Sequence, residues 1–244
     1  KGTENHDAIS LNNTIENFGG NVNAYTSFEE TAYHMVLSAR FWEKGLHLLL
    51  DMVFKSTLDE DEMETERGVI LEELKEGEDS LDLLLSEKFF ASLYPDHPYG
   101  RPVIGTVESI QNLTHVDLLK YYKKHYRPEN IVVSVAGNID WRQASESIRN
   151  YFSEMDFDKP SRAAIPKPLP PSEAPFFQIQ KGTEERMMEI AFPGPGVLHE
   201  DIPVFDIITF LLGEGDMSRL HQALQVKKNL VGSLETSTFT TQHV

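Results

Sequence analysis

An α+β fold in two domains is the arrangement that the sequence predicts, and three observations support it. Apolar residues recur at helical spacing in several stretches, and these alternate with stretches that favour strands. Residues 156–175 carry six prolines, which exclude regular structure and favour an extended, stiff connection. The same mixture resumes after that segment. We therefore expect a first domain at 1–155, a linker at 156–175 and the start of a second domain at 176–244.

The amino-terminal part predicts a helix followed by a β-hairpin. Residues 7–18 place apolar side chains at helical spacing, and Gly19-Gly20 is a stop signal for that helix. Residues 21–39 contain two stretches that favour strands, with a polar turn at 27–30 between them. One helix and two connected strands are therefore expected here.

The remainder of the first domain predicts helices and one buried strand. Helical patterns cover residues 41–55, 59–76, 81–93, 114–126 and 140–152. Asp59 stands near the start of the second of these helices, and Thr114 is the expected N-cap of the fourth. Residues 97–105 form a loop interrupted by proline and glycine. The continuous apolar run at 130–136 is typical of a buried strand.

The second domain predicts a similar mixture in a shorter length. Residues 176–180 and 187–192 favour strands. Helical patterns follow at 204–212 and 218–226, and the stretch at 231–240 is rich in strand-forming residues. The two domains are thus expected to have the same α+β character.

Composition excludes several function classes. A formal net charge of -17 argues against nucleic acid or an anionic membrane surface as a partner, because either would repel the chain. With no cysteine there is no disulfide framework and no thiolate metal site, so His, Asp and Glu are the candidate ligands. No apolar run approaches the roughly 20 residues that span a bilayer. Cytoplasm, periplasm and organelle are not distinguished by these properties.

The predicted helix at 59–76 carries two carboxylates on one face. Glu66 and Glu73 are seven residues apart, which is nearly two helical turns, so their side chains project within about 20° of each other. Acidic residues on a helix most often form a solvated face. A shared metal or catalytic site is the alternative that the spacing alone leaves open.

Several motifs in a fixed order surround this helix and carry a family resemblance. They are Lys1-Gly2-Thr3, Gly19-Gly20, Asn23-Ala24-Tyr25-Thr26, Glu30-Thr31-Ala32-Tyr33, Glu66 with Glu73, His97-Pro98-Tyr99-Gly100-Arg101-Pro102 and Tyr126-Arg127-Pro128-Glu129-Asn130. In this order and spacing the chain resembles the M16 zinc peptidases, the inverzincin group that contains pitrilysin, insulinase and the mitochondrial processing peptidases. The resemblance covers most of the first 155 residues.

The resemblance implies a fold and an activity. The fold is a pair of similar α+β domains, each a mixed or antiparallel sheet with helices packed on one face, of which the first lacks its amino-terminal part and the second is truncated. The activity is hydrolysis of peptide bonds by a zinc-activated water. Glu73 corresponds to the carboxylate ligand of zinc, and Glu66 to its catalytic companion. Asn23 and Ala24 correspond to an edge strand that receives the substrate as an added strand.

Two departures from the family pattern qualify this interpretation. The family's His-x-x-Glu-His signature is absent, and the nine histidines are scattered, so this fragment is expected to be inactive and to bind Zn²⁺ weakly or not at all. Gln225 and Gly232 occupy the positions of an Arg and a Tyr that the family's other half uses on the substrate carbonyl. A second half is therefore expected as partner, as a homodimer or heterodimer or further along the same parent chain.

Three functions follow from these observations. The first is part of a zinc endopeptidase that hydrolyses peptides or unfolded proteins in a clamshell chamber. The second is a non-catalytic scaffold or assembly subunit of the same fold. The third is a peptide-binding module that uses the exposed edge strand without hydrolysis.

Overall fold

The computed structural model describes residues 2–153, 155, 176–182 and 186–242. The chain divides into two compact units, which are described separately. Unit 1 comprises Lys1–Glu87 with Arg101–Ile165, and unit 2 comprises Lys88–Gly100 with Pro166–Val244. The expected linker at 156–175 lies outside the described residues, so the domain boundary there stays a prediction.

Unit 1 begins with the predicted helix and hairpin. Helix α1 (Ala8–Asn17) starts where the Asp7 side chain accepts a hydrogen bond from Ser10 N at 2.7 Å. Strands β1 (Asn21–Thr26) and β2 (Thr31–Val36) pair antiparallel, and Ser27 N donates to Glu30 O at 2.8 Å across the turn. The prediction of one helix and two strands is confirmed.

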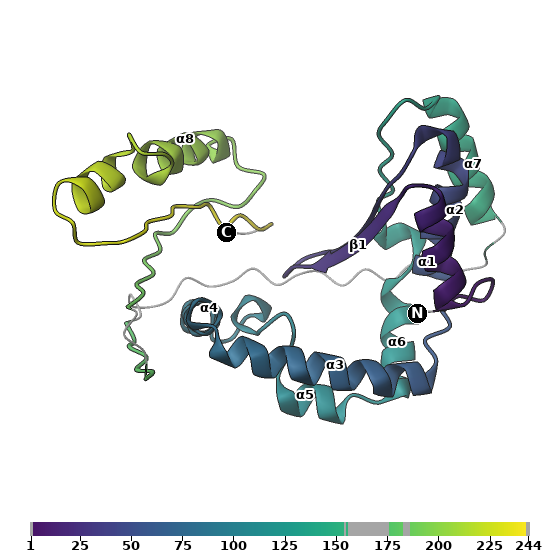
Figure 1. Cartoon of the computed structure of the whole chain (residues 1–244), viewed down its shortest axis with the longest axis horizontal. Helices are drawn as coiled ribbons and strands as arrows, with labels where there is room; N and C mark the ends of the chain where they lie inside the picture. Colours follow the sequence, from purple (N-terminus) through teal and green to yellow (C-terminus); the bar gives the residue numbers. More distant parts are fainter. Residues whose placement is uncertain (1, 154, 156–175, 183–185, 243–244) are drawn as a thin grey trace. The chain divides into compact units, whose positions relative to one another are not determined.

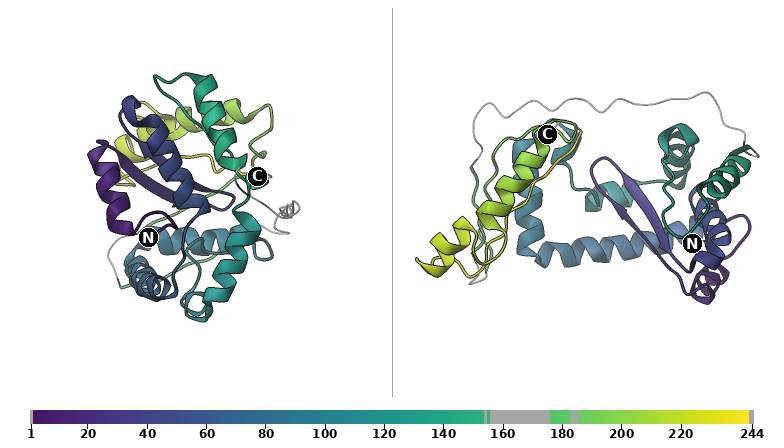
Figure 2. Two further views of the ribbon diagram at one scale, coloured as in Figure 1. Left: turned by 90° about the vertical axis from the view of Figure 1, so that its right-hand side faces the viewer. Right: turned by 90° about the horizontal axis from the view of Figure 1, so that it is seen from above.

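The core of unit 1 lies between this hairpin and the helices on one of its faces. Helix α2 (Trp42–Phe54) follows the short 3₁₀ helix η1 (Ala39–Phe41). Leu11, Ile15 and Leu48 form the buried cluster, and Val22 and Met35 of the strands pack against it. Both views of Figure 2 show the hairpin against α1 and α2. The apolar residues that recur at helical spacing in the sequence lie on the face that each of these helices buries.

Helix α7 (Trp141–Ser153) packs against α2. Ala144 is buried on this side, and the His47 ring Nε2 lies 2.8 Å from the Ser147 hydroxyl. Figure 1 shows α1, α2 and α7 together beside β1. The α2 helix is therefore covered on two sides, which explains why it contains more buried residues than any other described helix of unit 1.

Four further helices, α3, α5, α6 and the first part of α4, contribute to unit 1. Helix α3 (Glu60–Asp79) is long, and α5 (Val107–Asn112) runs beside it (Figure 1). Helix α6 (His115–His125) begins at its N-cap Thr114, as predicted, and its Tyr122 hydroxyl donates to Val53 O at 2.7 Å. The turn η3 (Pro128–Asn130) follows α6. Helix α4 (Leu81–Leu93) matches the predicted range and contributes residues to both units.

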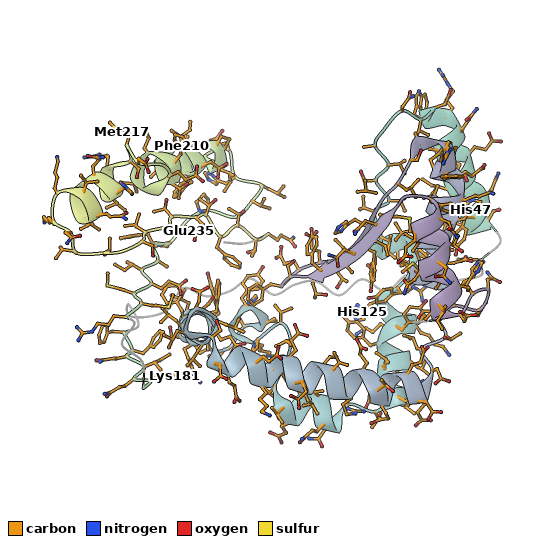
Figure 3. The ribbon with its side chains drawn as sticks, viewed as in Figure 1. His47, His125, Lys181, Phe210, Met217 and Glu235 are labelled. Atoms are coloured by element: carbon orange, nitrogen blue, oxygen red, sulfur yellow. The ribbon has the colours of Figure 1, made fainter. Side chains whose placement is uncertain are left out.

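Unit 2 is built from the end of α4, the turn η2 (Pro98–Gly100), helix α8 (Ile202–Gly213) and the π-helical segment η4 (His221–Val226). Phe239 stacks edge-on against Phe90, with ring centroids 4.7 Å apart. Tyr99 is 1% exposed beside the same rings. Figure 3 shows the side chains of α8 and of the segment after it, among them Phe210 and Met217, which are both largely exposed.

Four predicted strands are wrong in the residues that the structure describes. The strands expected at 130–136, 176–180, 187–192 and 231–240 are not formed. Asn130 ends the turn η3, and the other residues of these runs have no regular secondary structure. Val132 illustrates the difference, because the side chain expected in a buried strand is 92% exposed. A strand is stable only when a neighbour takes up its backbone N–H and C=O groups. Among the described residues the one sheet is the β1–β2 pair, so these runs have strand propensity without a partner.

The overall class is as the sequence predicts. Helices dominate the described chain, and the antiparallel sheet of unit 1 carries α1 and α2 on one face. The structure therefore confirms an α+β fold.

Candidate metal and substrate site

The acidic helix α3 begins where the sequence places its start. The Asp59 carboxylate accepts hydrogen bonds from Asp61 N at 2.9 Å and Glu62 N at 3.2 Å, which satisfies two free N–H groups of the first turn. The first turn also carries Glu60, Asp61 and Glu62, whose charges suit the positive end of the helix dipole. No residue of α3 is fully buried. It is a surface helix that one side chain clamps in place.

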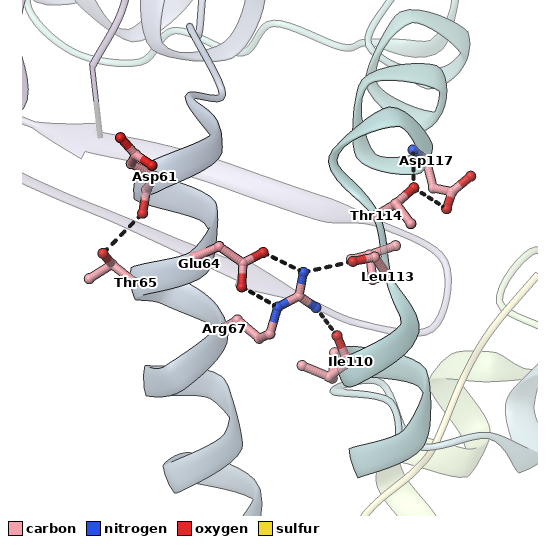
Figure 4. Close-up of polar contacts among 8 residues, drawn as sticks. All are labelled: Asp61, Glu64, Thr65, Arg67, Ile110, Leu113, Thr114 and Asp117. Carbon is pink, nitrogen blue, oxygen red and sulfur yellow. Dashed lines mark hydrogen bonds and ion pairs between the residues drawn. The ribbon is translucent and has the colours of Figure 1, made fainter.

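That clamp is Arg67 (Figure 4). Its guanidinium donates to both carboxylate oxygens of Glu64, at 2.8 and 3.0 Å. It also donates to Leu113 O at 2.7 Å and to Ile110 O, so it holds the connection between α5 and α6 against α3. A planar fork of donors fixes direction as well as distance. Arg67 therefore fixes the rotation of α3 about its own axis.

Electrostatics agree with a structural role for this pair. The hydrogen bond from Arg67 lowers the pKa of the Glu64 carboxyl, and the hydrogen bond to Glu64 raises the pKa of Arg67. A shallow hollow of about 420 Å³ lies here, lined by Glu60, Glu64, Arg67, Gln111, Asn112, Leu113, Thr114 and His115. The Arg67 donors are used within the chain.

Glu66 and Glu73 share a face of α3 that is turned away from this clamp. Successive residues of a helix are about 100° apart, so Glu66 lies about 100° round the axis from Arg67 and Glu73 about 120°. Glu66 is half-buried and Glu73 is exposed. Both glutamates thus project from one side of the helix.

The start of the chain lies beside the same face. Gly2 N donates to Glu62 Oε2 at 3.4 Å, and Glu62 is one turn before Glu66. Thr3 forms an isolated antiparallel bridge with Ser56, and Gly2 O accepts from Thr57 N at 3.2 Å. Residues 2–5 are named here the N-terminal strap. This strap is attached to the segment that leads into α3.

Zinc in a catalytic site takes three protein ligands, commonly two imidazoles and a carboxylate. Within the described parts of the chain, no group of three His, Asp or Glu side chains comes together in a way that could hold a metal ion. His115 and His47 contact Leu58 O and Ser147 within the fold, at 2.6 and 2.8 Å. Glu66 and Glu73 are therefore suitable in type but do not by themselves complete a zinc site.

Asn23 and Ala24 occupy adjacent positions in β1, opposite His34 and Tyr33 of β2. Both are exposed, and Ala24 N donates to the Asn23 side-chain Oδ1 at 2.8 Å. The sheet order places β2 on one side of β1, which leaves the other edge open among the residues described. The structure thus places these two residues on an accessible strand.

Gln225 and Gly232 lie together in unit 2. The Gln225 amide Nε2 donates to Gly232 O at 2.8 Å, so this side chain is engaged with the backbone of its own unit. Neither residue offers a cation or a phenol to a substrate carbonyl. Their placement agrees with the departure noted in the sequence.

A buried carboxylate that the sequence analysis missed is Asp51, on α2. It is 8% exposed and accepts hydrogen bonds from Tyr151 Oη at 2.7 Å and Asn5 Nδ2 at 2.7 Å, with Lys55 Nζ at 3.1 Å. Burial raises the pKa of Asp51, but the hydrogen bonds from Tyr151, Asn5 and Lys55 outweigh it and hold the pKa below its usual value. The available signal was an acidic residue within the otherwise apolar run 48–54.

Sequence comparison places these features in a family. Residues 1–107 match the insulinase family, peptidase family M16, and residues 112–243 match the M16 peptidase inactive domain. An uncharacterized zinc protease of Rickettsia bellii is 30% identical over 98% of this chain and 58% of its own length. The mouse mitochondrial-processing peptidase subunit beta is 32% identical over 89% of this chain and 45% of its own length.

Structural comparison agrees. A protease from Helicobacter pylori superposes with a TM-score of 0.82 and 29% identity, covering 100% of this chain and 59% of that protein. The chain thus spans less than two thirds of each of these relatives. No helix in the described ranges is long and apolar enough to cross a membrane. The resemblance seen in the motifs is confirmed, and the chain belongs to peptidase family M16.

Proposed function

We propose that the whole protein is a zinc-dependent endopeptidase that hydrolyses peptides or unfolded proteins in a clamshell chamber, and that this chain supplies part of its metal site. The observation that carries the proposal is the hydrogen bond from Gly2 N to Glu62, one turn before Glu66 on the same face of α3. Residues that precede Gly2 in the whole protein would then begin beside that face. The Rickettsia bellii relative is named as a zinc protease, which supports zinc-dependent peptide hydrolysis as the reaction class.

The two glutamates take different roles in this proposal. Seven residues of helix rise about 10 Å, which is too far for both carboxylates to bind one ion. Glu73 is the proposed zinc ligand, and Glu66 is the proposed catalytic companion that orients a ligand or water by hydrogen bonding. The imidazole ligands would come from residues outside this chain. Zinc, when bound, would polarise the peptide carbonyl and activate a water.

Strand β1 is the proposed substrate-binding edge. A peptide that pairs with it would use backbone hydrogen bonds, which tolerate many sequences. In this structure the Ala24 N–H donates to Asn23 Oδ1. In the complex it would donate to a substrate carbonyl instead. The small Ala24 side chain lets the incoming backbone approach.

A second half of the same fold is the proposed partner. Gln225 and Gly232 lack the charge and the phenol that would stabilise an oxyanion at the substrate carbonyl. The partner half would supply that pair, either as another subunit or from the rest of the same protein.

Zinc content of the whole protein tests the ligand assignment. We expect about one zinc per protein by elemental analysis, lost for the most part in Glu73→Gln because a neutral amide is a poor zinc ligand. Glu72→Gln is the matched control, since Glu72 is on the same helix but about 100° round its axis. Full zinc content in Glu73→Gln would discard the assignment.

The same preparation separates the alternative functions. A scaffold subunit predicts no zinc in the wild-type protein and no peptide cleavage. A peptide-binding module predicts peptide affinity that a chelator leaves unchanged. The endopeptidase predicts cleavage that a chelator abolishes and added zinc restores.

A further inference from the structure

Asp51 joins three segments of unit 1 that are far apart in the sequence. Asn5 is in the N-terminal strap, Lys55 is at the end of α2, and Tyr151 is in α7. The two carboxylate oxygens divide these partners. Oδ1 accepts from Tyr151 and Lys55, whereas Oδ2 accepts from Asn5. One side of the buried carboxylate is therefore directed at the strap.

A continuous set of hydrogen bonds leads from Asp51 to α3. Glu4 N donates to Lys55 O at 2.9 Å, next to the Asn5 contact. Thr3 then bridges to Ser56, Thr57 donates to Gly2 O, and Gly2 N reaches Glu62. The strap is thus held by Asp51 at one end and by the first turn of α3 at the other.

This arrangement has a geometric consequence for the face that carries Glu66 and Glu73. Arg67 fixes the rotation of α3, and Asp51 fixes the strap. Together these contacts hold Gly2 next to Glu62, which lies on that face. Charge-assisted hydrogen bonds are suited to this, because they are short and directional.

We propose that Asp51 is a positioning residue that fixes the N-terminal strap and thereby sets how the residues before it meet the acidic face of α3. The proposal rests on the proposed function, since the site that it positions is the proposed zinc site. Asp51 contacts neither metal nor substrate in this scheme. It acts through Asn5.

Two substitutions, each of which removes one hydrogen-bond partner of Asp51, separate a positioning role from simple stabilisation of the fold. Asn5→Ala removes the strap contact and keeps Tyr151 and Lys55, whereas Tyr151→Phe removes the α7 contact and keeps the strap. Asn5 is exposed, so its substitution leaves the core intact. Asp51→Asn keeps the size of the side chain but loses its charge.

Hydrogen exchange on this chain is the first measurement. The amides of Thr3, His6 and Thr57 report on the strap, because their hydrogen bonds close it. We expect their exchange to quicken about tenfold in Asn5→Ala and Asp51→Asn relative to the α6 amides, and to be unchanged in Tyr151→Phe. Unchanged strap exchange in Asn5→Ala would overturn the proposal.

Zinc affinity of the whole protein, measured by chelator competition, is the second measurement. We expect Asn5→Ala and Asp51→Asn to weaken zinc binding about tenfold, the size typical of losing an outer support, and Tyr151→Phe to leave it unchanged. A looser strap with unchanged affinity would overturn the positioning role. Absence of zinc from the wild-type protein would remove the proposed function and the positioning role together, while the exchange data still show whether Asp51 holds the strap.

Discussion

At the scale of residues, two charged side chains organise unit 1 by different physical means. Arg67 lies at the surface and joins α3 to main-chain carbonyls of the next connection. Asp51 is buried, and a buried carboxylate is tolerated only when donors surround it. Arg67 was visible in the sequence only as one charge on an acidic helix. Its partners were not.

Stability should depend on pH through Asp51. Its pKa in the folded protein is lowered, so its contribution is present above the unfolded pKa of about 3.9 and is lost as pH falls through the folded value. We expect Asp51→Asn to reduce the free energy of unfolding by about 1–3 kcal/mol at pH 7, and the deficit to shrink as the pH falls below the unfolded pKa and through the lowered folded pKa. Urea unfolding of both proteins between pH 7 and pH 2.5 measures this. A deficit that stays constant over that range would contradict it.

At the scale of elements, helices were predicted well and isolated strands were not. Helix signals are local, because the N-cap, the apolar spacing and the stop residues all lie within the helix or beside it. The hairpin was predictable for the same reason, since β1 and β2 are joined by a short turn. The run at 130–136 has the composition of a strand, but a strand also requires a neighbour that its own residues do not specify.

The N-cap of α3 provides an element-scale prediction. Asp59→Ala should destabilise the first turns of α3 by about 1 kcal/mol, because two N–H groups lose their acceptor. Hydrogen exchange of the Glu62 and Met63 amides measures that opening. Asp59→Asn is the control and should stay close to wild type, since asparagine caps helices as well as aspartate does. Equal exchange in the alanine variant and the wild type would show that the cap contributes nothing.

At the scale of the whole molecule, charge is the dominant global property. The chain carries 39 acidic and 22 basic side chains, and such an excess of like charge destabilises a compact state by self-repulsion. Salt shortens the range of that repulsion.

Added salt should therefore stabilise the protein at pH 7. We expect the thermal midpoint to rise by about 2–5 °C between 20 and 500 mM NaCl, which corresponds to roughly 1 kcal/mol. Circular dichroism melts in NaCl and KCl measure the effect, and equal shifts in both salts identify screening rather than binding of one ion. A midpoint that falls with salt would mean that the attractive pairs, such as Arg67 with Glu64, outweigh the repulsion.

The candidate site, like the fold, was predictable from the sequence only in part. The spacing of Glu66 and Glu73 determined that they share a helix face, and the motif order determined the family. The approach of Gly2 to Glu62 and the burial of Asp51 were not predictable, because each joins residues that are distant in sequence.

The sequence by itself thus determined the described α-helices other than α5, the hairpin, the acidic face of α3 and membership of family M16, since periodicity, caps and motifs act over short stretches of chain. The tertiary structure alone decided which strand-forming runs found a partner, how Arg67 orients α3, and that Asp51 gathers Asn5 and Tyr151 from 46 and 100 residues away. The physical reason is that pairing and burial depend on the whole packed unit, and a buried charge is stable only where packing brings its donors together.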